Sequence, residues 1–444
     1  MPMFSTIHLF STKYIFLPFI VKFLNGIVGK SNETLDLIIP TLQFKKRFGG
    51  QKVDNNNEEF TEPITLLIEN PIRFCFLMLL DPKLGLGEAF MDGHWRAEPG
   101  PTEFLKLLIR AKKIRNQEKD SKRRKTQMKI LISKVFQLLL NVNFRKFWSI
   151  INYCQHKIRE NTLLQSARNI KDHYDLGNDM FELFLDESMT YSCALFENAE
   201  SQMDYNVDCL KEAQERKLDM LIDRLKLSEN DHVLEIGCGW GSCAIRAVKR
   251  YGCKWTGLTI SKEQLAWAQR KVQEAGLSHL IDLKYLDYRL EQGVYSKVIS
   301  IEMIEAVGEK YLPEYFQVIN DRLESGGKAV LQAIICPDSY YDRYCKSSDF
   351  IRKHIFPGGH LPSLNHIQRC LPDGVDLCEE ITSIGLHYAK TLDYWLNAWC
   401  EKESQILDLN YSATFHRKWQ FYFALCSSLF SYNHINVIQF SLQK

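Results

Sequence analysis

Three glycines at alternate positions form a candidate ligand-binding turn. The segment LEIGCGWGSC covers residues 234–243 and places Gly237, Gly239 and Gly241 directly after a short apolar run. Because glycine has no Cβ atom and adopts left-handed backbone conformations freely, such a turn lets a ligand lie against the main chain. A tight strand-to-helix turn without any ligand uses the same residues. The glycines alone therefore leave both interpretations open.

The spacing of this turn differs from that of a dinucleotide-binding turn. The dinucleotide pattern is G-x-G-x-x-G with an acidic residue about 20 positions later. Here the glycines read G-x-G-x-G, and Thr259 and Gln264 follow the next apolar run where that acid would stand. With Glu235 included, the pattern E-x-G-x-G-x-G resembles the first motif of S-adenosylmethionine-dependent methyltransferases. The resemblance implies a turn that contacts the methionine and ribose parts of that cofactor.

Further motifs narrow the resemblance to one family. They are IKDHYDLGNDMFELFLDESMTYSCALF (170–196), GLTISKEQLAWAQ (257–269), LDYR (286–289), EMIEAVGEKYL (302–312) and DFIRKHIFPGGHLPS (349–363). Together with the glycine turn they resemble the cyclopropane-fatty-acyl-phospholipid synthase family, in its plant-type branch. LGLGEAFMDGHW near residue 90 is similar to the family's separate N-terminal domain. The resemblance thus covers all but roughly the first thirty residues.

The resemblance implies addition of a methyl group from S-adenosylmethionine across a cis double bond of a phospholipid acyl chain. An alkene is a weak nucleophile, so positioning must supply much of the acceleration. The transfer leaves a carbocation, which aromatic faces stabilise in a site that excludes water. The candidates for this role are Tyr191, Phe196, Tyr388 and Phe421. Aromatic side chains equally serve as core, and that alternative stays open for each of them.

A base must then take a proton from the added methyl group to close the ring. In the family a bound bicarbonate does this. The resemblance assigns its binding site to Cys193, Glu305, Tyr388 and the backbone amide of Ile334. Gln332 stands where many members have a histidine, and its neutral amide donates a hydrogen bond without supplying charge. Glu305 needs a proton between itself and the anion, because two bare negative charges in contact repel.

The resemblance also supplies the cofactor positions, and it raises one further catalytic candidate. The positions expected to bind S-adenosylmethionine are Tyr191, Ser192, Glu235, Gly237, Cys238, Gly239, Gly241, Thr259, Gln264, Tyr288 and Arg289. Cys426 matches a cysteine once regarded as a nucleophile in the family. The reaction needs no thiolate, and a cysteine among apolar neighbours is usually inert core. Cys426 is therefore the weakest of the catalytic candidates.

The segments that carry these motifs predict an α/β fold. From Val233 onward short apolar strands alternate with helical stretches such as 244–249, 262–274 and 312–323. Alternation of this kind indicates a parallel sheet with helices on both faces, where ligands bind beyond the carboxyl ends of the strands. We expect a Rossmann-like methyltransferase domain over 166–444, preceded by a smaller α+β domain over 31–110 and a basic and apolar helical linker over 111–165.

Composition excludes several other classes of protein. The chain has 444 residues, and 56 Lys and Arg against 54 Asp and Glu give a net charge of +2. That balance provides no global field to attract nucleic acid. The 13 cysteines follow neither zinc nor disulfide spacing, so we expect no metal and a reducing compartment. The first 30 residues are apolar but interrupted by charges, and membrane-surface binding, targeting and plain packing remain open for them.

One segment suggests a membrane surface as a partner. Ten basic residues against two acidic ones lie between Arg110 and Lys129, next to the apolar stretch ILISKVFQLLL. Such a run binds anionic lipid or simply forms a solvated linker. We expect a cytoplasmic, peripheral membrane enzyme, with a homodimer as an open alternative to a monomer. The rival activities are formation of a methyl or methylene branch, methylation of a small amine on the same scaffold, and non-catalytic lipid binding.

Overall fold

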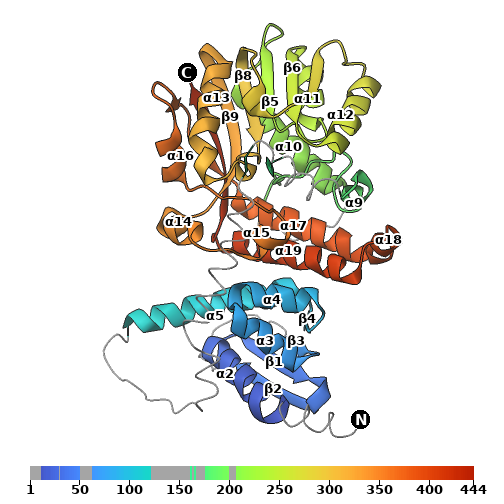
Figure 1. The fold of residues 1–444 in the computed structure, drawn as a ribbon, viewed down its shortest axis with the longest axis vertical. Helices are drawn as coiled ribbons and strands as arrows, with labels where there is room; N and C mark the ends of the chain where they lie inside the picture. The colour runs from blue at the N-terminus through green and yellow to red at the C-terminus, as the bar shows by residue number, and fades with distance from the viewer. Residues whose placement is uncertain are drawn as a thin grey trace. The chain divides into compact units, whose positions relative to one another are not determined.

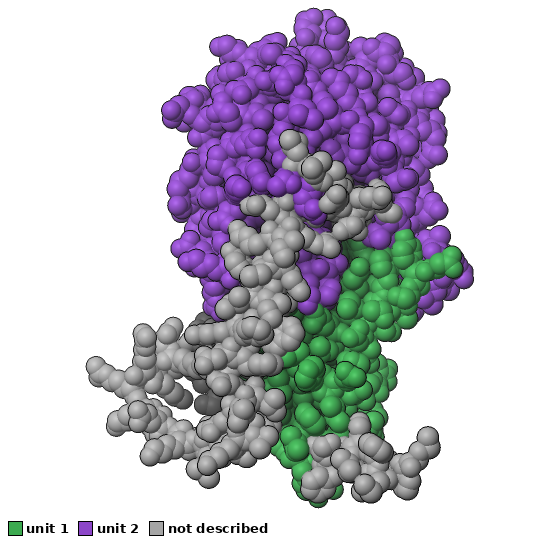
Figure 2. All heavy atoms as spheres, viewed as in Figure 1, with its two compact units in different colours: residues 1–152, 410–428 green, residues 153–409, 429–444 purple. Residues whose placement is uncertain are grey.

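The computed structural model describes residues 12–29, 31–50, 63–121, 161–162, 165–166, 176–199 and 207–444. The chain forms two compact units, coloured separately in Figure 2. The first comprises residues 1–152 and 410–428, and the second comprises residues 153–409 and 429–444. Residues 410–428 thus group with the N-terminal part of the chain, although the sequence interpretation had placed them in the catalytic domain. The domain boundaries expected at residues 30, 110 and 165 stay predictions.

The first unit is a four-stranded sheet with helices. Its strands are β1 (Thr34–Ile39), β2 (Phe44–Gly49), β3 (Ile64–Ile68) and β4 (Trp95–Glu98), in the order β2-β1-β3-β4. Only the β1–β3 pair is parallel. The helical elements are η1 (Thr12–Phe16), α2 (Leu17–Val28), η2 (Pro40–Leu42), α3 (Pro71–Leu80), α4 (Pro82–Met91), α5 (Pro101–Ser121) and most of α19 (Ala413–Ser431).

Helix α2 accounts for most of the apolar opening stretch that the structure describes. Ile20, Leu24 and Val28 are buried at intervals of four residues, which places them on one face of the helix. Packing therefore explains this face, and residues 1–11 lie outside the described part. Within the described residues no helix is both long and apolar enough to cross a bilayer.

The second unit contains the predicted α/β sheet (Figure 1). Its strand order is β10-β12-β9-β8-β5-β6-β7, and β11 pairs with β12. The strands are β5 (His232–Ile236), β6 (Lys254–Thr259), β7 (Ile281–Tyr285), β8 (Tyr295–Ile301), β9 (Leu323–Ile335), β10 (Asp376–Leu377), β11 (Thr382–Ser383) and β12 (Asn436–Gln443). Strands β5 to β9 run parallel, whereas β12 runs antiparallel to β9. The prediction of a parallel sheet is confirmed.

Helices cover both faces of this sheet, as predicted. The longer helices of the second unit are α10 (Val207–Leu225), α11 (Ser242–Tyr251), α12 (Lys262–Glu274), α13 (Leu312–Arg322), α14 (Asp338–Cys345) and α17 (Gly385–Glu401). The shorter ones are α9 (Asn178–Glu182), η3 (Tyr288–Leu290), η4 (Ile304–Ala306), η5 (Glu309–Tyr311), α15 (Phe350–His354), α16 (Leu364–Cys370) and α18 (Glu403–Asp408). Leu234 of β5 packs with α13 and α16, while the adjacent Val233 packs with α10, α11 and α12. This alternation is what a strand buried on both faces requires.

Candidate active site

The glycine turn connects β5 to α11 with left-handed backbone at each glycine. The φ angles of Gly237, Gly239 and Gly241 are +85°, +51° and +88°. A Cβ atom at Gly237 would lie 2.8 Å from Cγ of Met303, and one at Gly241 would lie 3.1 Å from Cβ of Ala268. A Cβ atom at Gly239 would have no other described residue within 4 Å, apart from its neighbours in the chain. Gly237 and Gly241 therefore permit close packing, and Gly239 leaves space for a ligand.

A cavity that is partly open to solvent lies at the carboxyl ends of β5, β6 and β8. This is where an α/β sheet binds its ligands. The expected cofactor residues that line it are Tyr191, Ser192, Glu235, Gly237, Cys238, Gly239, Thr259, Gln264, Tyr288 and Arg289. Gly241 does not line it and is instead the N-cap residue that precedes α11. The sequence-derived positions thus converge on one cavity.

The polar residues on the cofactor side are held by neighbouring side chains. Trp255 Nε1 donates to Glu235 Oε2 at 2.9 Å, and burial raises the pKa of Glu235 to about 7. Thr259 Oγ1 donates to Gln264 Oε1 at 3.0 Å, which orients the Gln264 amide. Ser261 caps α12 just beside them. These contacts fix the positions of hydrogen-bonding groups along the cavity wall.

Arg289 organises the far side of the cavity. Its guanidinium donates to both carboxylate oxygens of Asp287, at 2.8 Å and 2.7 Å, and also to Ser166 Oγ at 3.1 Å. The hydrogen bonds from Arg289 are bidentate, so they fix the orientation of the Asp287 carboxylate at the cavity wall. Sequence reasoning missed Asp287, although it stands inside the LDYR motif.

Glu302 lies at the centre of a second group of polar residues. This residue follows β8 directly and lines the cavity. Its Oε1 atom accepts from the Cys193 amide at 2.9 Å and from Gln332 Nε2 at 2.7 Å. Its Oε2 atom accepts from the Tyr388 hydroxyl at 2.8 Å. The structure thus brings together Cys193, Gln332 and Tyr388, as expected, but around a carboxylate that sequence reasoning did not select.

Glu305 lies one turn further on, in η4. One carboxyl oxygen accepts from the Ile334 amide, and the other is buried with no hydrogen-bond partner among the described residues. Burial, and next the charge of Glu302, raise the pKa of Glu305 to about 8. Burial also raises the pKa of Glu302. The three hydrogen bonds to its carboxylate and the charge of the nearby Lys217 act in the opposite direction and lower that pKa. The raised pKa of Glu305 favours its protonated form, whereas the three hydrogen bonds donated to the Glu302 carboxylate favour the ionised form of Glu302.

Cys193 and Lys217 complete this group in different ways. The Cys193 thiol contacts the carbonyl oxygens of Ala194 and Ile384, and burial holds its pKa well above the usual value. Cys193 thus contributes its backbone amide and keeps a neutral thiol. Lys217 is fully buried in α10, and its Nζ donates to Ser192 Oγ at 2.6 Å. Burial lowers the pKa of Lys217, and the nearby charge of Glu302 opposes that effect.

The aromatic candidates fall into three places. Tyr191 and Tyr388 both contact Trp395, with ring centroids 5.1 Å and 5.9 Å away. Phe196 stacks on Tyr394 at 5.4 Å. Phe421 belongs to the first unit and packs against Phe90 and Trp95, and Cys426 is a buried residue of the same unit. Tyr191 and Tyr388 therefore share one aromatic cluster, in which Trp395 was not predicted from the sequence.

Comparison with known proteins identifies the family. The family model described as mycolic acid cyclopropane synthetase matches residues 161–440. This chain belongs to that family. It is 33% identical over 369 residues to the tuberculostearic acid methyltransferase of Mycobacterium tuberculosis, which covers 81% of this chain and 78% of the relative. It is 31% identical over 380 residues to the cyclopropane-fatty-acyl-phospholipid synthase of Escherichia coli, covering 85% and 87% respectively.

Solved structures agree with the family assignment. A mycolic acid cyclopropane synthase in complex with SAH and CTAB has a TM-score of 0.57 and 31% identity, covering 63% of this chain and 98% of that one. A cyclopropane synthase from Mycobacterium tuberculosis has a TM-score of 0.57 and 30% identity over similar shares of both chains. The protein is thus an S-adenosylmethionine-dependent methyltransferase of the cyclopropane synthase family. Its place in a plant-type branch stays a prediction.

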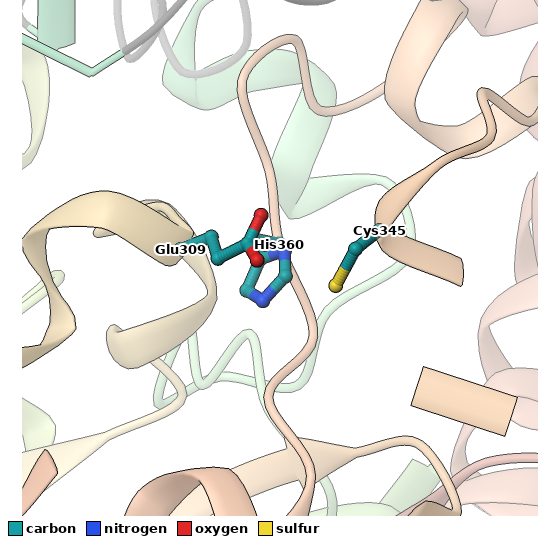
Figure 3. A group of neighbouring side chains, drawn as sticks. All are labelled: Glu309, Cys345 and His360. Atoms are coloured by element: carbon teal, nitrogen blue, oxygen red, sulfur yellow. The ribbon is translucent and has the colours of Figure 1, made fainter. Parts of the chain in front are cut away.

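One group of potential metal ligands lies beside the family motifs. Glu309, Cys345 and His360 lie close together, with ligand atoms within 4.8 Å of one another (Figure 3). His360 Nε2 shares a hydrogen bond with the Tyr341 hydroxyl at 2.9 Å. Burial, and next the charge of Glu309, raise the pKa of Cys345 to about 11. A neutral thiol is a poor ligand, and we assign no metal to this group.

Proposed function

We propose that the protein transfers a one-carbon unit from S-adenosylmethionine to the cis double bond of an unsaturated phospholipid acyl chain and closes a cyclopropane ring. The observation that carries this proposal is a pair of acidic side chains at the glycine-turn cavity. Glu302 lines the cavity and accepts a hydrogen bond from the Tyr388 hydroxyl, and Glu305 accepts one from the Ile334 amide. A reaction through a carbocation needs a proton acceptor, because the cation must lose a proton to close the ring, and an ionised carboxylate at the cavity can take that proton.

The residues around the cavity fit S-adenosylmethionine. The open space at Gly239 would accept the cofactor against the main chain, with Tyr191 and Ser192 on the methionine side and Thr259 and Gln264 on the ribose side. Tyr288 and Arg289 would face the adenine. When bound, the cofactor supplies an electrophilic methyl group. The protein must hold an alkene in line with that group, and this positioning accounts for much of the acceleration.

Aromatic rings would protect the cationic intermediate. Tyr191 and Tyr388 each contact Trp395 and form a cluster around it, and the Tyr388 hydroxyl donates a hydrogen bond to Glu302. Ring faces attract a cation by about 2 kcal/mol when the site is desolvated. We propose that this cluster shields the cation until the proton leaves. The acceptor of that proton is a bicarbonate ion, as the resemblance implies, or a carboxylate of the protein itself.

A second candidate function is formation of a methyl or methylene branch on the acyl chain. It is favoured by the similarity to a tuberculostearic acid methyltransferase and to a probable fatty acid methyltransferase of Pseudomonas putida, at 33% and 34% identity. An amine acceptor is less well supported. The coclaurine N-methyltransferase structure has a TM-score of 0.51 at 16% identity, which is a likeness of fold alone.

The proposal extends to the site of action. We propose that the basic segment 110–129 binds anionic lipid, so that the enzyme is cytoplasmic and works at a membrane surface. Most of this segment lies outside the residues whose side chains the structure describes. A homodimer stays a prediction.

Product analysis tests the proposed function. The purified protein is incubated with S-adenosylmethionine and vesicles of mono-unsaturated phospholipid, and the fatty acids are examined by mass spectrometry. We expect a fatty acid heavier by one CH2 that resists hydrogenation, as a ring does and a methylene branch does not. A product that takes up hydrogen would contradict ring closure and would support formation of a methylene branch, the second candidate function. Absence of any heavier fatty acid would overturn both.

A further inference from the structure

We infer that Glu302 takes the place of bicarbonate in this enzyme and is the group that accepts the proton from the added methyl carbon. The inference rests on the proposed function and names the base of that reaction. It also makes catalysis independent of any free anion. Glu302 then belongs to the catalytic residues, and Gln332 and Gln439 act through it as positioning residues.

The hydrogen-bond donors of the expected bicarbonate site already have an acceptor. The Cys193 amide, Gln332 Nε2 and the Tyr388 hydroxyl all donate to the Glu302 carboxylate, at 2.9, 2.7 and 2.8 Å. A carboxylate and a bicarbonate present the same planar pair of anionic oxygens, so one can substitute for the other. A bicarbonate added beside Glu302 would place two negative charges in contact, which is unfavourable. These three donors therefore bind one anionic group, and in this protein that group is the Glu302 carboxylate.

The backbone at Glu302 is strained in a way that aims the side chain. Its φ angle is +50°, in the left-handed region that non-glycine residues rarely adopt. Such a conformation costs about 1–3 kcal/mol and persists where the surrounding structure enforces it, often at functional sites. Here the Glu302 amide donates to the Gln332 carbonyl at 2.8 Å. The same two residues are thus joined through both main chain and side chain.

Gln332 is itself held in one orientation. Gln439 stands opposite it in the β9–β12 register, and Gln439 Nε2 donates to Gln332 Oε1 at 2.8 Å. This contact leaves Gln332 Nε2 to donate to Glu302. Both glutamines are buried, with exposed fractions of 1% and 0%. The two glutamines thus hold an uncharged donor, Gln332 Nε2, beside the Glu302 carboxylate.

The charges around Glu302 suit a proton acceptor. Lys217 is buried nearby and favours the ionised form of Glu302. Glu305 holds the proton of the acidic pair, because burial and the Glu302 charge raise its pKa to about 8. Burial raises the pKa of Glu302 as well, and a carboxylate with a raised pKa is a stronger base. Together with the three hydrogen bonds that Glu302 accepts, these charges favour one ionised carboxylate facing the cavity.

The proposed step balances in atoms and electrons. One alkene carbon forms a bond to the methyl carbon, and the carbon–sulfur bond breaks with its electron pair moving to sulfur. The other alkene carbon becomes the cation. Glu302 removes one proton from the added methyl carbon, and the electron pair of that C–H bond forms the last bond of the ring. Glu302 ends as a carboxylic acid and returns its proton to solvent before the next turnover.

Bicarbonate dependence tests the inference. Turnover on unsaturated vesicles is measured in buffer freed of carbon dioxide and again with added bicarbonate. We expect the wild type to be equally active in both. Glu302→Gly keeps the left-handed backbone and removes the carboxylate, so turnover should fall about 100-fold or more and recover in part with bicarbonate or formate. Glu302→Gln fills the space with an amide and should be inactive with or without added anion.

Controls separate a catalytic loss from misfolding. Each variant is titrated with S-adenosylhomocysteine by calorimetry, and we expect affinity near that of the wild type. Glu309→Gln removes an exposed carboxyl group seven residues away that does not line the cavity, and it should leave turnover unchanged. A wild type that requires bicarbonate, or a fully active Glu302→Gln variant, would overturn the inference.

A binding measurement keeps the inference distinct from the proposed function. Binding of carbon-13 bicarbonate is followed by NMR in the S-adenosylhomocysteine complex, without any lipid. We expect no saturable binding to the wild type and saturable binding to Glu302→Gly. Bicarbonate bound by the wild type in competition with formate would contradict the inference whatever the lipid assay gives. Failure of the wild type to modify lipid would instead contradict the proposed function.

Discussion

Gln439 on β12 donates from its side-chain amide to the side-chain oxygen of Gln332 on β9, and the two residues face each other across an antiparallel pair of strands. Neither side chain bears a charge, yet the contact fixes which end of the Gln332 amide faces Glu302. The orientation of the proposed base is thus set by the last strand of the chain, more than one hundred residues further on.

Removing this contact should slow turnover without weakening cofactor binding. Gln439→Met keeps the volume and deletes the donor, so Gln332 is free to rotate and Glu302 loses a fixed partner. Comparable outer contacts change activity by about 10- to 100-fold, and we expect a fall in kcat within that range with KM for S-adenosylmethionine unchanged. Gln443→Met, on the same strand, removes hydrogen bonds to the Gly326 and Gly327 carbonyls and serves as the control. Equal kcat values for the two variants would refute the positioning role.

Tyr388→Phe should shift the pH profile of the reaction. The Tyr388 hydroxyl donates to Glu302, and a hydrogen bond to the charged form lowers a carboxyl pKa. Without it the pKa of Glu302 rises further, so a higher pH is needed to ionise the base. We expect the acidic limb of the kcat profile to move to higher pH, with a lower kcat below it. Tyr394→Phe on the same helix is the control, and an unshifted limb in Tyr388→Phe would count against Glu302 as the base.

Glu305 should make folding stability depend on pH. Its pKa is raised to about 8 in the fold, while an unfolded Glu ionises near its ordinary value. Between these values the folded state binds more protons than the unfolded state, so stability falls as pH rises, by up to about 1.4 kcal/mol per pH unit. Glu305→Gln cannot ionise and should lose much of this slope. Thermal melts from pH 5 to pH 8 measure it, and parallel slopes for the two proteins would show that Glu305 is ionised throughout.

The glycine turn should be sensitive at Gly237 in particular. Gly237→Ala imposes both a left-handed φ and a Cβ atom 2.8 Å from Met303 Cγ, whereas Gly276→Ala imposes a left-handed φ of +71° in open space. Each carries about 1–2 kcal/mol of backbone strain. We expect only Gly237→Ala to weaken S-adenosylhomocysteine binding in calorimetry. Similar affinity in both variants would mean that the turn does not contact the ligand.

The basic segment is tested by charge reversal. Substitution of Arg123, Arg124 and Lys125 by Glu should weaken binding to anionic vesicles on the order of 100-fold, since each cation contributes about 1 kcal/mol. Turnover on those vesicles should fall while S-adenosylhomocysteine affinity stays constant. Zwitterionic vesicles provide the control, because they lack the attraction. Unchanged turnover on anionic vesicles would remove the membrane-docking role.

Much of the fold could be predicted from local patterns in the sequence. The apolar runs ending at Ile236 and Thr259 and the helical stretches between them indicate a parallel sheet, and the glycine spacing marks its ligand end. The grouping of residues 410–428 with the first unit could not be predicted, because the apolar residues of α19 indicate that the helix is packed but do not specify against which unit.

The site could be predicted only in part, for a similar reason. Two carboxyl groups three residues apart, in IEMIE, were a visible signal for Glu302, but the resemblance assigned a role to Glu305 alone. The part played by Gln439 depends on the register of β12 against β9, which local sequence does not encode. Lys217 lies in α10, and the sequence pattern of that helix does not tell whether this lysine is exposed or buried. Long-range pairing therefore decides the details of the site.

The fate of the methyl hydrogens tests the central claim most directly. The protein is supplied with S-adenosylmethionine carrying a trideuterated methyl group and with unsaturated phospholipid vesicles in buffer free of bicarbonate, and the modified fatty acid is weighed by mass spectrometry. We predict a hydrogenation-resistant product that retains two of the three deuterium atoms, formed as fast as when bicarbonate is present. A product that keeps all three deuterium atoms, or one that forms only with added bicarbonate, would contradict proton abstraction from the methyl carbon by Glu302.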